Sequence, residues 1–177
     1  IFKIKKGLYT FHSDPFLVAT FILKPSYISS VSALFYWHRI TQLPNYVFCS
    51  TSKRTKKHYF ITEIHFLHTN WFFGFELVEY KNFKIPIATP EKAIIDSIGS
   101  VPLSLIEEAF DEIDLERMLA YLKKIKKSSV VKRIGYFLEK AGYNVYSELK
   151  EFINSKYIDL DPLVKGKRKN ERWKVKL

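Results

Sequence analysis

Short stretches in which apolar and polar residues alternate with period two predict the strands of this chain. In residues 1–12 apolar residues alternate with lysines and the pattern turns at Gly7, which predicts two short strands. Residues 46–52 predict a third strand, and residues 74–80 and 83–89 predict a hairpin that turns at Lys81 and Asn82. Because these connections are short, we expect the middle third to form a small, mostly antiparallel sheet.

Residues 58–68 alternate over their whole length and predict one long strand. Its two faces would carry Tyr59, Ile61, Glu63 and His65 on one side, and Phe60, Thr62, Ile64 and Phe66 on the other. Glu63 and His65 would therefore point the same way, and a metal site built on them is one hypothesis. Two residues are not a ligand set, however, and the spacing of a zinc site is missing. A partly exposed strand face is the simpler interpretation.

Capping residues in front of apolar runs predict the helices of the first half. Asp14 followed by a proline begins a short buried helix over residues 16–23, which Lys24 and Pro25 end. Ser29 or Ser30 begins a second helix that runs to about residue 39. The second helix is expected to bury Val31, Leu34, Phe35, Tyr36, Trp37 and His38 and to expose Ser26, Ser29, Ser30 and Ser32.

The later part of the chain is predicted to be helical. Thr89 and Pro90 begin one helix, and further helices are expected over residues 102–110, 114–125, 129–142 and 146–157, with a terminal strand over 173–177. The fold class is therefore α+β: a small mixed or antiparallel sheet packed with helices, followed by a helical C-terminal half. We expect residues 1–12 to be a separate hairpin and residues 13–177 to form one α+β domain.

Composition limits the possible partners. The chain has 177 residues and a net charge of +11, which favours an anionic partner such as nucleic acid. Cys49 is the only cysteine, so a disulfide framework is excluded and a reducing cytoplasm is expected. No apolar run approaches the roughly 18 residues that a membrane span needs, so no membrane association is expected.

The basic residues occur in separate clusters, and each could contact phosphate. The first two clusters are the hairpin of residues 1–12 and the loop between residues 52 and 58, and another bridges two predicted helices. A basic turn near the C-terminus, residues 165–172, is a further cluster. The candidate DNA contacts are Lys3, Lys5 and Lys6, with Lys53, Arg54, Lys56, Lys57, Lys123, Lys124, Lys126, Lys127, Lys132 and Arg133 as auxiliary backbone contacts. Each cluster taken alone is also typical of a solvated surface.

Two enzymatic interpretations compete with simpler ones. The serines near His38 lack the glycine-flanked turn of a nucleophilic serine, and residues 14–62 hold a single carboxylate, Asp14, so helix capping explains them better. Glu79 and Lys81 form an acid-x-lysine pair that would suit a metal-dependent nuclease. That site would need a second acid from Glu63 or Glu76.

Several phrases, spread over nearly the whole chain, resemble the AbiEi-type antitoxins and related transcriptional regulators of abortive-infection systems. They are "IKKGLYTF", "PSYISSVSAL", "FITEIHF", "IPIATPEKAIIDSI", "VKRIGYFLEKAG" and "IDLDP" followed by "NERWKVKL". The resemblance implies that residues 1–12 are the end of the wing of a winged helix-turn-helix. The helices that precede the wing would then lie before Ile1.

The function that the resemblance implies is transcriptional regulation. Such a protein represses its own operon by binding double-stranded operator DNA and counteracts a nucleotidyltransferase-like toxin of a toxin–antitoxin system. The expectation is a cytoplasmic, non-enzymatic protein without a cofactor or metal. The alternatives are the metal-dependent nuclease using Glu79 and Lys81 and a protein-interaction module with a basic surface.

Overall fold

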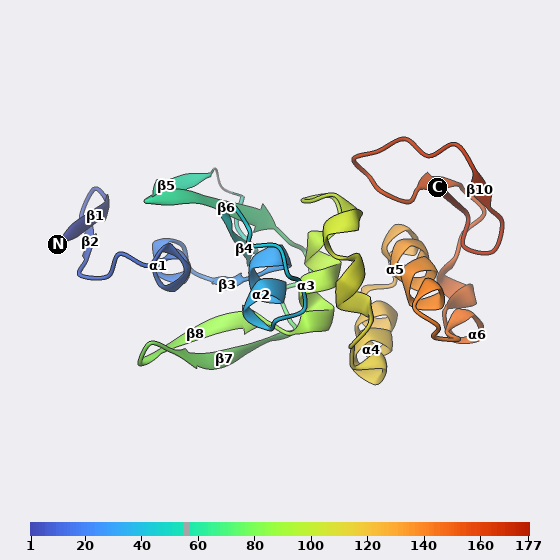
Figure 1. Ribbon diagram of the computed structural model, residues 1–177, viewed down its shortest axis with the longest axis horizontal. Coiled ribbons are helices and arrows are strands. Elements are labelled where there is room, and N and C mark those ends of the chain that lie inside the picture. The colour runs from blue at the N-terminus through green and yellow to red at the C-terminus, as the bar shows by residue number, and fades with distance from the viewer. Residues whose placement is uncertain (55–56) are drawn as a thin grey trace. The chain divides into compact units, whose positions relative to one another are not determined.

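The computed structural model describes residues 1–54 and 57–177 and has an α+β fold (Figure 1). The chain divides into two compact units, Ile1–Asp96 (unit 1) and Ser97–Leu177 (unit 2). Unit 1 contains a mixed sheet packed with helices, and unit 2 is mainly helical with a small sheet near the C-terminus. The α+β class predicted from the sequence is thereby confirmed.

The main sheet of unit 1 has the strand order β5-β6-β4-β3-β8-β7. Its strands are β3 (Ser26–Ile28), β4 (Val47–Thr51), β5 (His58–Phe60), β6 (Thr62–His68), β7 (Phe75–Tyr80) and β8 (Phe83–Ala88). β3 runs parallel to β8 and β4 runs parallel to β6, while the other neighbours are antiparallel. The sheet is therefore mixed, because some neighbouring strands are joined by long connections and others by short turns.

The N-terminal segment forms the hairpin and helix that the sequence predicts. β1 (Phe2–Lys5) pairs with β2 (Leu8–Thr10) through a turn in which Gly7 has a φ of +77°, a conformation that glycine adopts freely. α1 (Pro15–Ile22) follows, and the Asp14 side chain accepts hydrogen bonds from the backbone N–H groups of Phe16 and Leu17. α1 packs against β3, β4 and β8.

The serines of residues 26–32 lie inside unit 1, so the expectation that they are exposed is wrong. α2 (Ser30–Tyr36) begins after Ser29, but the Ser29 side chain makes no capping hydrogen bond. A short strand that the sequence did not predict, β3, precedes α2 and lies in the middle of the sheet. The serines of this segment are therefore buried. The Ser32 hydroxyl accepts from the Phe48 N–H at 2.9 Å and donates to the Tyr46 carbonyl. Burial of the Ser32 hydroxyl is thus offset by hydrogen bonds to the backbone.

The aromatic end of α2 is less buried than predicted. Phe35, Tyr36 and Trp37 are only partly covered, and His38 is exposed. The Trp37 indole N–H donates to the carbonyl of Ala88 at 2.8 Å, which ties α2 to β8.

The predicted long strand 58–68 is two strands, β5 and β6, which turn back on each other at Ile61. Ile61 has a φ of +64°, and Phe60 pairs with Thr62 across the turn. Residues directly opposite in an antiparallel pair share a face, so Phe60, Thr62 and Ile64 still point the same way. The predicted alternation is correct, but the predicted continuity of the strand is wrong.

The hairpin of residues 74–89 agrees with its prediction. β7 and β8 pair along their length in an extended ribbon, and Lys81 and Asn82 form the turn with φ values of +48° and +67° (Figure 1). Positive φ at both central residues matches the right-handed twist of the strands. α3 (Pro90–Ser97) begins immediately afterwards, and the Thr89 hydroxyl accepts a hydrogen bond from the Lys92 N–H.

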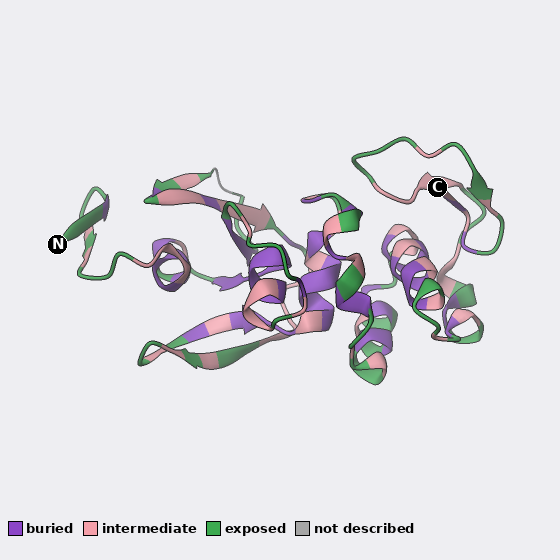
Figure 2. Cartoon of the chain, in the orientation of Figure 1, coloured by how far each residue is buried: buried purple, intermediate pink, exposed green. Residues whose placement is uncertain are grey.

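Unit 2 packs its helices around one apolar core. It contains α4 (Leu115–Ile125), α5 (Ser128–Lys140) and the short α6 (Tyr146–Leu149). The expected helix over 102–110 is instead two 3-10 turns, η1 (Leu103–Leu105) and η2 (Glu107–Phe110), and the expected helix over 146–157 ends as a third, η3 (Lys150–Phe152). Val130, Val131, Ile134, Phe137 and Leu138 are buried on α5, and parts of its coil are purple in Figure 2.

The small sheet of unit 2 packs the C-terminus against α5. β11 (Val175–Lys176) pairs with β10 (Lys169–Asn170) and β9 (Ile158–Asp159), and it lies within the predicted terminal strand. Trp173, which is completely buried, lies over Gly135 of α5, where a Cβ atom would approach its ring to 2.1 Å. The indole N–H of Trp173 donates to Glu139.

Candidate nucleic-acid interface

The predicted wing lysines lie on the exposed side of the β1–β2 hairpin. Lys3, Lys5 and Lys6 are all exposed, whereas Ile4 between them is buried. Lys3 stands directly opposite Tyr9 in the hairpin, and that tyrosine is also exposed. The Lys5 ammonium donates to the carbonyl of Ile22 at the end of α1. The hairpin therefore presents lysines outward while one apolar residue anchors it.

Two contacts join this hairpin to strand β5. The His58 ring nitrogen Nε2 lies 3.1 Å from the carbonyl oxygen of Ile4. The rings of Phe2 and Phe60 meet edge to face with their centroids 6.4 Å apart. Lys57 is the residue before His58, and Lys3 and Lys5 are the residues on either side of Ile4. The contact between His58 and Ile4 therefore brings together cations from two distant parts of the sequence. We use the name basic cluster for Lys3, Lys5, Lys6 and Lys57, together with Lys53 and Arg54, which follow β4 in the sequence.

The loop residues of the basic cluster are exposed. Lys53, Arg54 and Lys57 all face solvent, and Lys56 lies outside the described residues. Lys57 forms an ion pair with Glu63 at 3.2 Å, which is a surface pair that contributes little to stability. Residues 1–62 contain Asp14 as their only carboxylate, so this part of unit 1 is strongly cationic.

Glu63 and His65 do lie together, as the sequence suggested. The Glu63 carboxylate is 2.7 Å from His65 Nε2, and hydrogen bonds from His65 and Lys57 lower the pKa of Glu63. Among the residues that the structure describes, no group of three or more His, Cys, Asp or Glu side chains is placed to hold a metal ion. The Glu63 carboxylate is thus bound by His65 and Lys57.

Four of the auxiliary candidates lie at the junction of α4 and α5 in unit 2. Lys123, Lys124, Lys126 and Lys127 are exposed, and Lys126 ends α4 with a φ of +52°. The Lys123 ammonium forms an ion pair with Glu148 at 2.7 Å. This junction is cationic, and the charge of Lys123 is paired with that of Glu148.

The side chains of Lys132 and Arg133 make hydrogen bonds within unit 2. Lys132 is almost fully buried, and its ammonium donates to the Asn154 side chain and to the carbonyl of Lys156. The Arg133 guanidinium donates to the carbonyls of Asp159 and Leu160. Burial lowers the pKa of both groups. These two side chains hold the C-terminal segment on α5, and we leave them out of the interface proposed below.

The acid-x-lysine pair has a different environment from the one a nuclease needs. Lys81 forms an ion pair with Asp14, which also accepts a hydrogen bond from the Tyr80 hydroxyl at 2.9 Å. Burial alone would raise the pKa of Asp14, but the hydrogen bonds from Lys81 and Tyr80 outweigh it and lower that pKa. Glu79 is exposed and stands opposite Lys84 on the neighbouring strand. The carboxylate beside Lys81 therefore belongs to a helix cap.

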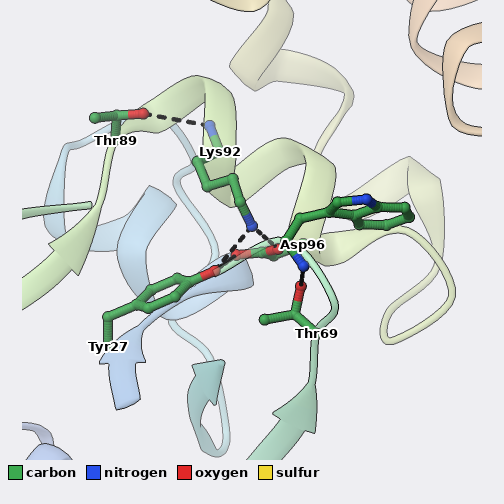
Figure 3. Close-up of polar contacts among 6 residues, drawn as sticks. Tyr27, Thr69, Thr89, Lys92 and Asp96 are labelled. Atoms are coloured by element: carbon green, nitrogen blue, oxygen red, sulfur yellow. Dashed lines mark hydrogen bonds and ion pairs between the residues drawn. The ribbon is translucent and has the colours of Figure 1, made fainter. Parts of the chain in front are cut away.

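A buried polar triad, missed by the sequence reasoning, fixes α3 to the sheet. The Lys92 ammonium donates to Asp96 one helical turn further on and to the Tyr27 hydroxyl, while that hydroxyl donates to Asp96 at 2.9 Å (Figure 3). Burial raises the pKa of Asp96 and lowers that of Lys92, and the opposite charge of each partner counters the shift. Burial also raises the pKa of Tyr27.

The triad is enclosed by aromatic rings. The Lys92 ammonium lies 5.4 Å from the Tyr27 ring centroid and 5.6 Å from that of Phe73. The side chains of Lys92 and Asp96 are 0% and 5% exposed, so substrate has no access to them. The signal in the sequence was the i, i+4 spacing of Lys92 and Asp96 around the apolar residues Ala93, Ile94 and Ile95.

An open cavity of about 460 Å³ lies beside the C-terminal end of α2. Its walls are mainly aromatic, and we call it the aromatic pocket. The residues that form it are Phe16, Ser32, Phe35, Tyr36, His38, Leu43, Pro44, Tyr46, Val47 and Tyr80. They come from three separated parts of unit 1, and no motif in the sequence marks them as a group.

Comparisons with known proteins add no family assignment. A scan of protein-family models gives no match, and a search of curated protein sequences finds no related protein. Among the described residues, no helix has both the length and the apolar character required to cross a membrane. The resemblance to AbiEi-type regulators stays a prediction that depends on the phrases quoted above.

Proposed function

We propose that this chain is a DNA-binding transcriptional regulator of the antitoxin kind, which contacts the DNA backbone through its basic cluster. The observation that carries the proposal is the contact between Ile4 and His58, which brings the hairpin lysines next to Lys57. The resemblance of residues 1–12 to the wing of a winged helix supports the same surface. Autorepression and neutralisation of a nucleotidyltransferase-like toxin in the cytoplasm complete the proposal.

The physical basis of binding is the release of counterions from DNA. Each phosphate neutralised by a lysine or arginine makes the slope of log K against log salt steeper by about 0.9. The described members of the basic cluster are exposed. Lys57 is paired with Glu63, but residues 1–62 hold Asp14 as their sole carboxylate, so the surface keeps a net positive charge. Backbone contacts of this kind orient a protein on the duplex without reading its sequence.

The test is a salt titration with duplex DNA from the region upstream of the gene. Fluorescence anisotropy would compare the unchanged chain with the triple variant Lys3→Gln, Lys5→Gln, Lys6→Gln. We expect the variant to bind more weakly to all sequences. Its salt slope should become shallower by about 0.9 for each phosphate that the substituted lysines no longer neutralise.

A matched control removes the same number of charges from unit 2. The variant Lys150→Gln, Lys165→Gln, Lys167→Gln changes three exposed lysines. We expect it to keep most of the affinity and slope. Equal losses in the two variants would show that net charge alone drives binding, and an unchanged slope in the hairpin variant would remove the hairpin from the interface.

Neutralisation of the toxin is tested in cells. The neighbouring gene product would be expressed alone and together with this chain, and growth would be followed. Restored growth with the chain is expected, whereas toxicity that persists at equal expression would contradict the antitoxin role. Co-purification of the two proteins would separately show whether neutralisation involves direct contact.

A further inference from the structure

The aromatic pocket offers flat surfaces at two places. The rings of Phe16 and Tyr36 are stacked with centroids 5.8 Å apart and planes at 19°, and Tyr80 packs against both. Tyr46 stacks on His65 at 4.5 Å with planes at 14°, so one face of the Tyr46 ring is backed and held. Stacked rings of this kind are platforms for a planar ligand.

The size of the pocket is that of a small-molecule site. Its volume of about 460 Å³ falls in the range of roughly 300 to 1,000 Å³ that is typical of ligand pockets. Tyr36 is only partly covered and Tyr46 is 42% exposed, although both are large aromatic residues in a unit with an extensive core. The apolar walls are therefore open to a ligand from solvent.

The charges around the pocket favour an anionic ligand over a cationic one. None of the described residues that line it carries a carboxylate. Asp14, which accepts a hydrogen bond from Tyr80, is already matched by Lys81. Glu63, which bonds to the His65 ring behind Tyr46, is paired with Lys57. The Lys81 ammonium lies 5.3 Å from the centroid of the Tyr80 ring, at the edge of the pocket, and its side chain is 59% exposed.

We propose that the aromatic pocket binds a nucleobase, stacked between tyrosine rings, with its phosphate turned toward the exposed ammonium of Lys81, which the phosphate would share with Asp14. A nucleotide combines the two properties that the pocket matches, a planar ring and a negative charge. The proposal rests on the nucleic-acid function proposed above and extends it from the phosphate backbone to an unpaired base. The base could belong to a free nucleotide or to a single strand, and the experiment distinguishes these sources.

The experiment compares ligands that have the same phosphates with and without bases. Tryptophan fluorescence would be titrated with a ten-nucleotide deoxyadenosine strand and with an abasic strand of the same length; Trp37, whose ring meets Tyr36 at 4.9 Å, is the reporter. We expect the strand with bases to bind about fivefold or more tightly, which is the lower end for one stacked base. Adenosine monophosphate and ribose 5-phosphate form the second pair of ligands.

Two variants and a control test whether the preference for bases depends on the aromatic pocket. Tyr46→Ala and Tyr36→Leu, which keeps an apolar side chain in the wall, are each expected to remove the preference for bases. Tyr59→Ala, which removes an aromatic ring at a 70% exposed position outside the pocket, should retain it. Binding of adenosine monophosphate with the same dependence would identify a free nucleotide as the ligand. A preference seen only with the strand would identify single-stranded nucleic acid.

The failure of this proposal is separate from the failure of the proposed function. Equal affinity for the strands with and without bases, or equal loss in Tyr59→Ala, would overturn the base site. The duplex salt titration would stand in either case, because it depends on the lysines of the hairpin and not on the aromatic pocket.

Discussion

Ile61 is held in a backbone conformation that suits it poorly. Its φ of +64° lies in the left-handed region, where a β-branched side chain costs about 1–2 kcal/mol. The side chain is 51% exposed, so its replacement removes little packing. We expect Ile61→Asn to raise the free energy of unfolding by about 1 kcal/mol in urea titrations. Tyr59→Asn, at an exposed position of β5, is the control and should not stabilise unit 1.

The buried triad makes a prediction about paired charges. Removing the cation in Lys92→Met leaves Asp96 buried without its charge partner, which typically costs about 3–5 kcal/mol. The double variant Lys92→Met, Asp96→Leu removes both charges and should lose less stability than the single variant. Urea unfolding of the unchanged chain, Lys92→Met, Asp96→Leu and the double variant measures the coupling between the two side chains. Additive losses would show that the ammonium and carboxylate do not act as a pair.

The Asp14–Lys81 pair predicts a pH dependence. The pKa of Asp14 is lower in the folded protein than its ordinary value of 3.8. The resulting stabilisation is fully present above that ordinary value and is lost as the pH falls through the folded pKa, because protonation removes the charge. In thermal unfolding from about pH 6 down to about pH 3, Lys81→Gln should lose less stability on acidification than the unchanged chain. An identical loss would mean that Lys81 has no effect on the titration of Asp14.

At the scale of elements, local signals were sufficient wherever local contacts decide the structure. The helix starts at Asp14 and Thr89 and the Lys81–Asn82 turn involve side chains and backbone groups within three residues of each other, and each was predicted. β3 was missed because a three-residue strand carries little periodic signal and forms through pairing with β4 and β8. The reversal at Ile61 was missed because isoleucine gives no turn signal.

The contact between α5 and the C-terminal segment of unit 2 leaves no room for a side chain at Gly135. A Cβ atom there would lie 2.1 Å from the Trp173 ring, so Gly135→Ala must displace the indole or the helix. We expect a loss of about 1–3 kcal/mol, the usual cost of overpacking, together with a red shift of the tryptophan emission. Gly142→Ala is a poor control because its φ is +96°, so Ser129→Ala, at a half-buried position of the same helix, serves instead.

At the scale of the whole molecule, the sequence identified the charged segments but not their neighbours. The lysines of residues 3–6 and of the loop after β4 were recognised as separate clusters, yet the proximity of Lys57 to the hairpin depends on the His58–Ile4 contact, which joins residues 54 positions apart. The aromatic pocket depends in the same way on Phe16, Tyr46 and Tyr80 meeting in the fold. The sequence predicts Lys132 and Arg133 as surface cations, because the groups to which they hydrogen-bond lie more than twenty residues away along the chain.

The contact between the hairpin and β5 can be tested without substituting a lysine or an arginine. His58→Ala removes the ring that meets the Ile4 carbonyl and leaves every lysine and arginine of the basic cluster in place. Without this ring the hairpin can move relative to the loop, and ordering it again on DNA costs affinity.

We therefore expect His58→Ala to bind duplex DNA about threefold or more weakly with an unchanged salt slope, measured by anisotropy at about pH 8. His68→Ala, at the exposed end of β6, is the matched control and should bind like the unchanged chain. Full affinity in His58→Ala would show that the two basic segments do not need to be held together. A reduced salt slope would instead mean that the substitution has removed a cation from the DNA, contrary to the role assigned to His58.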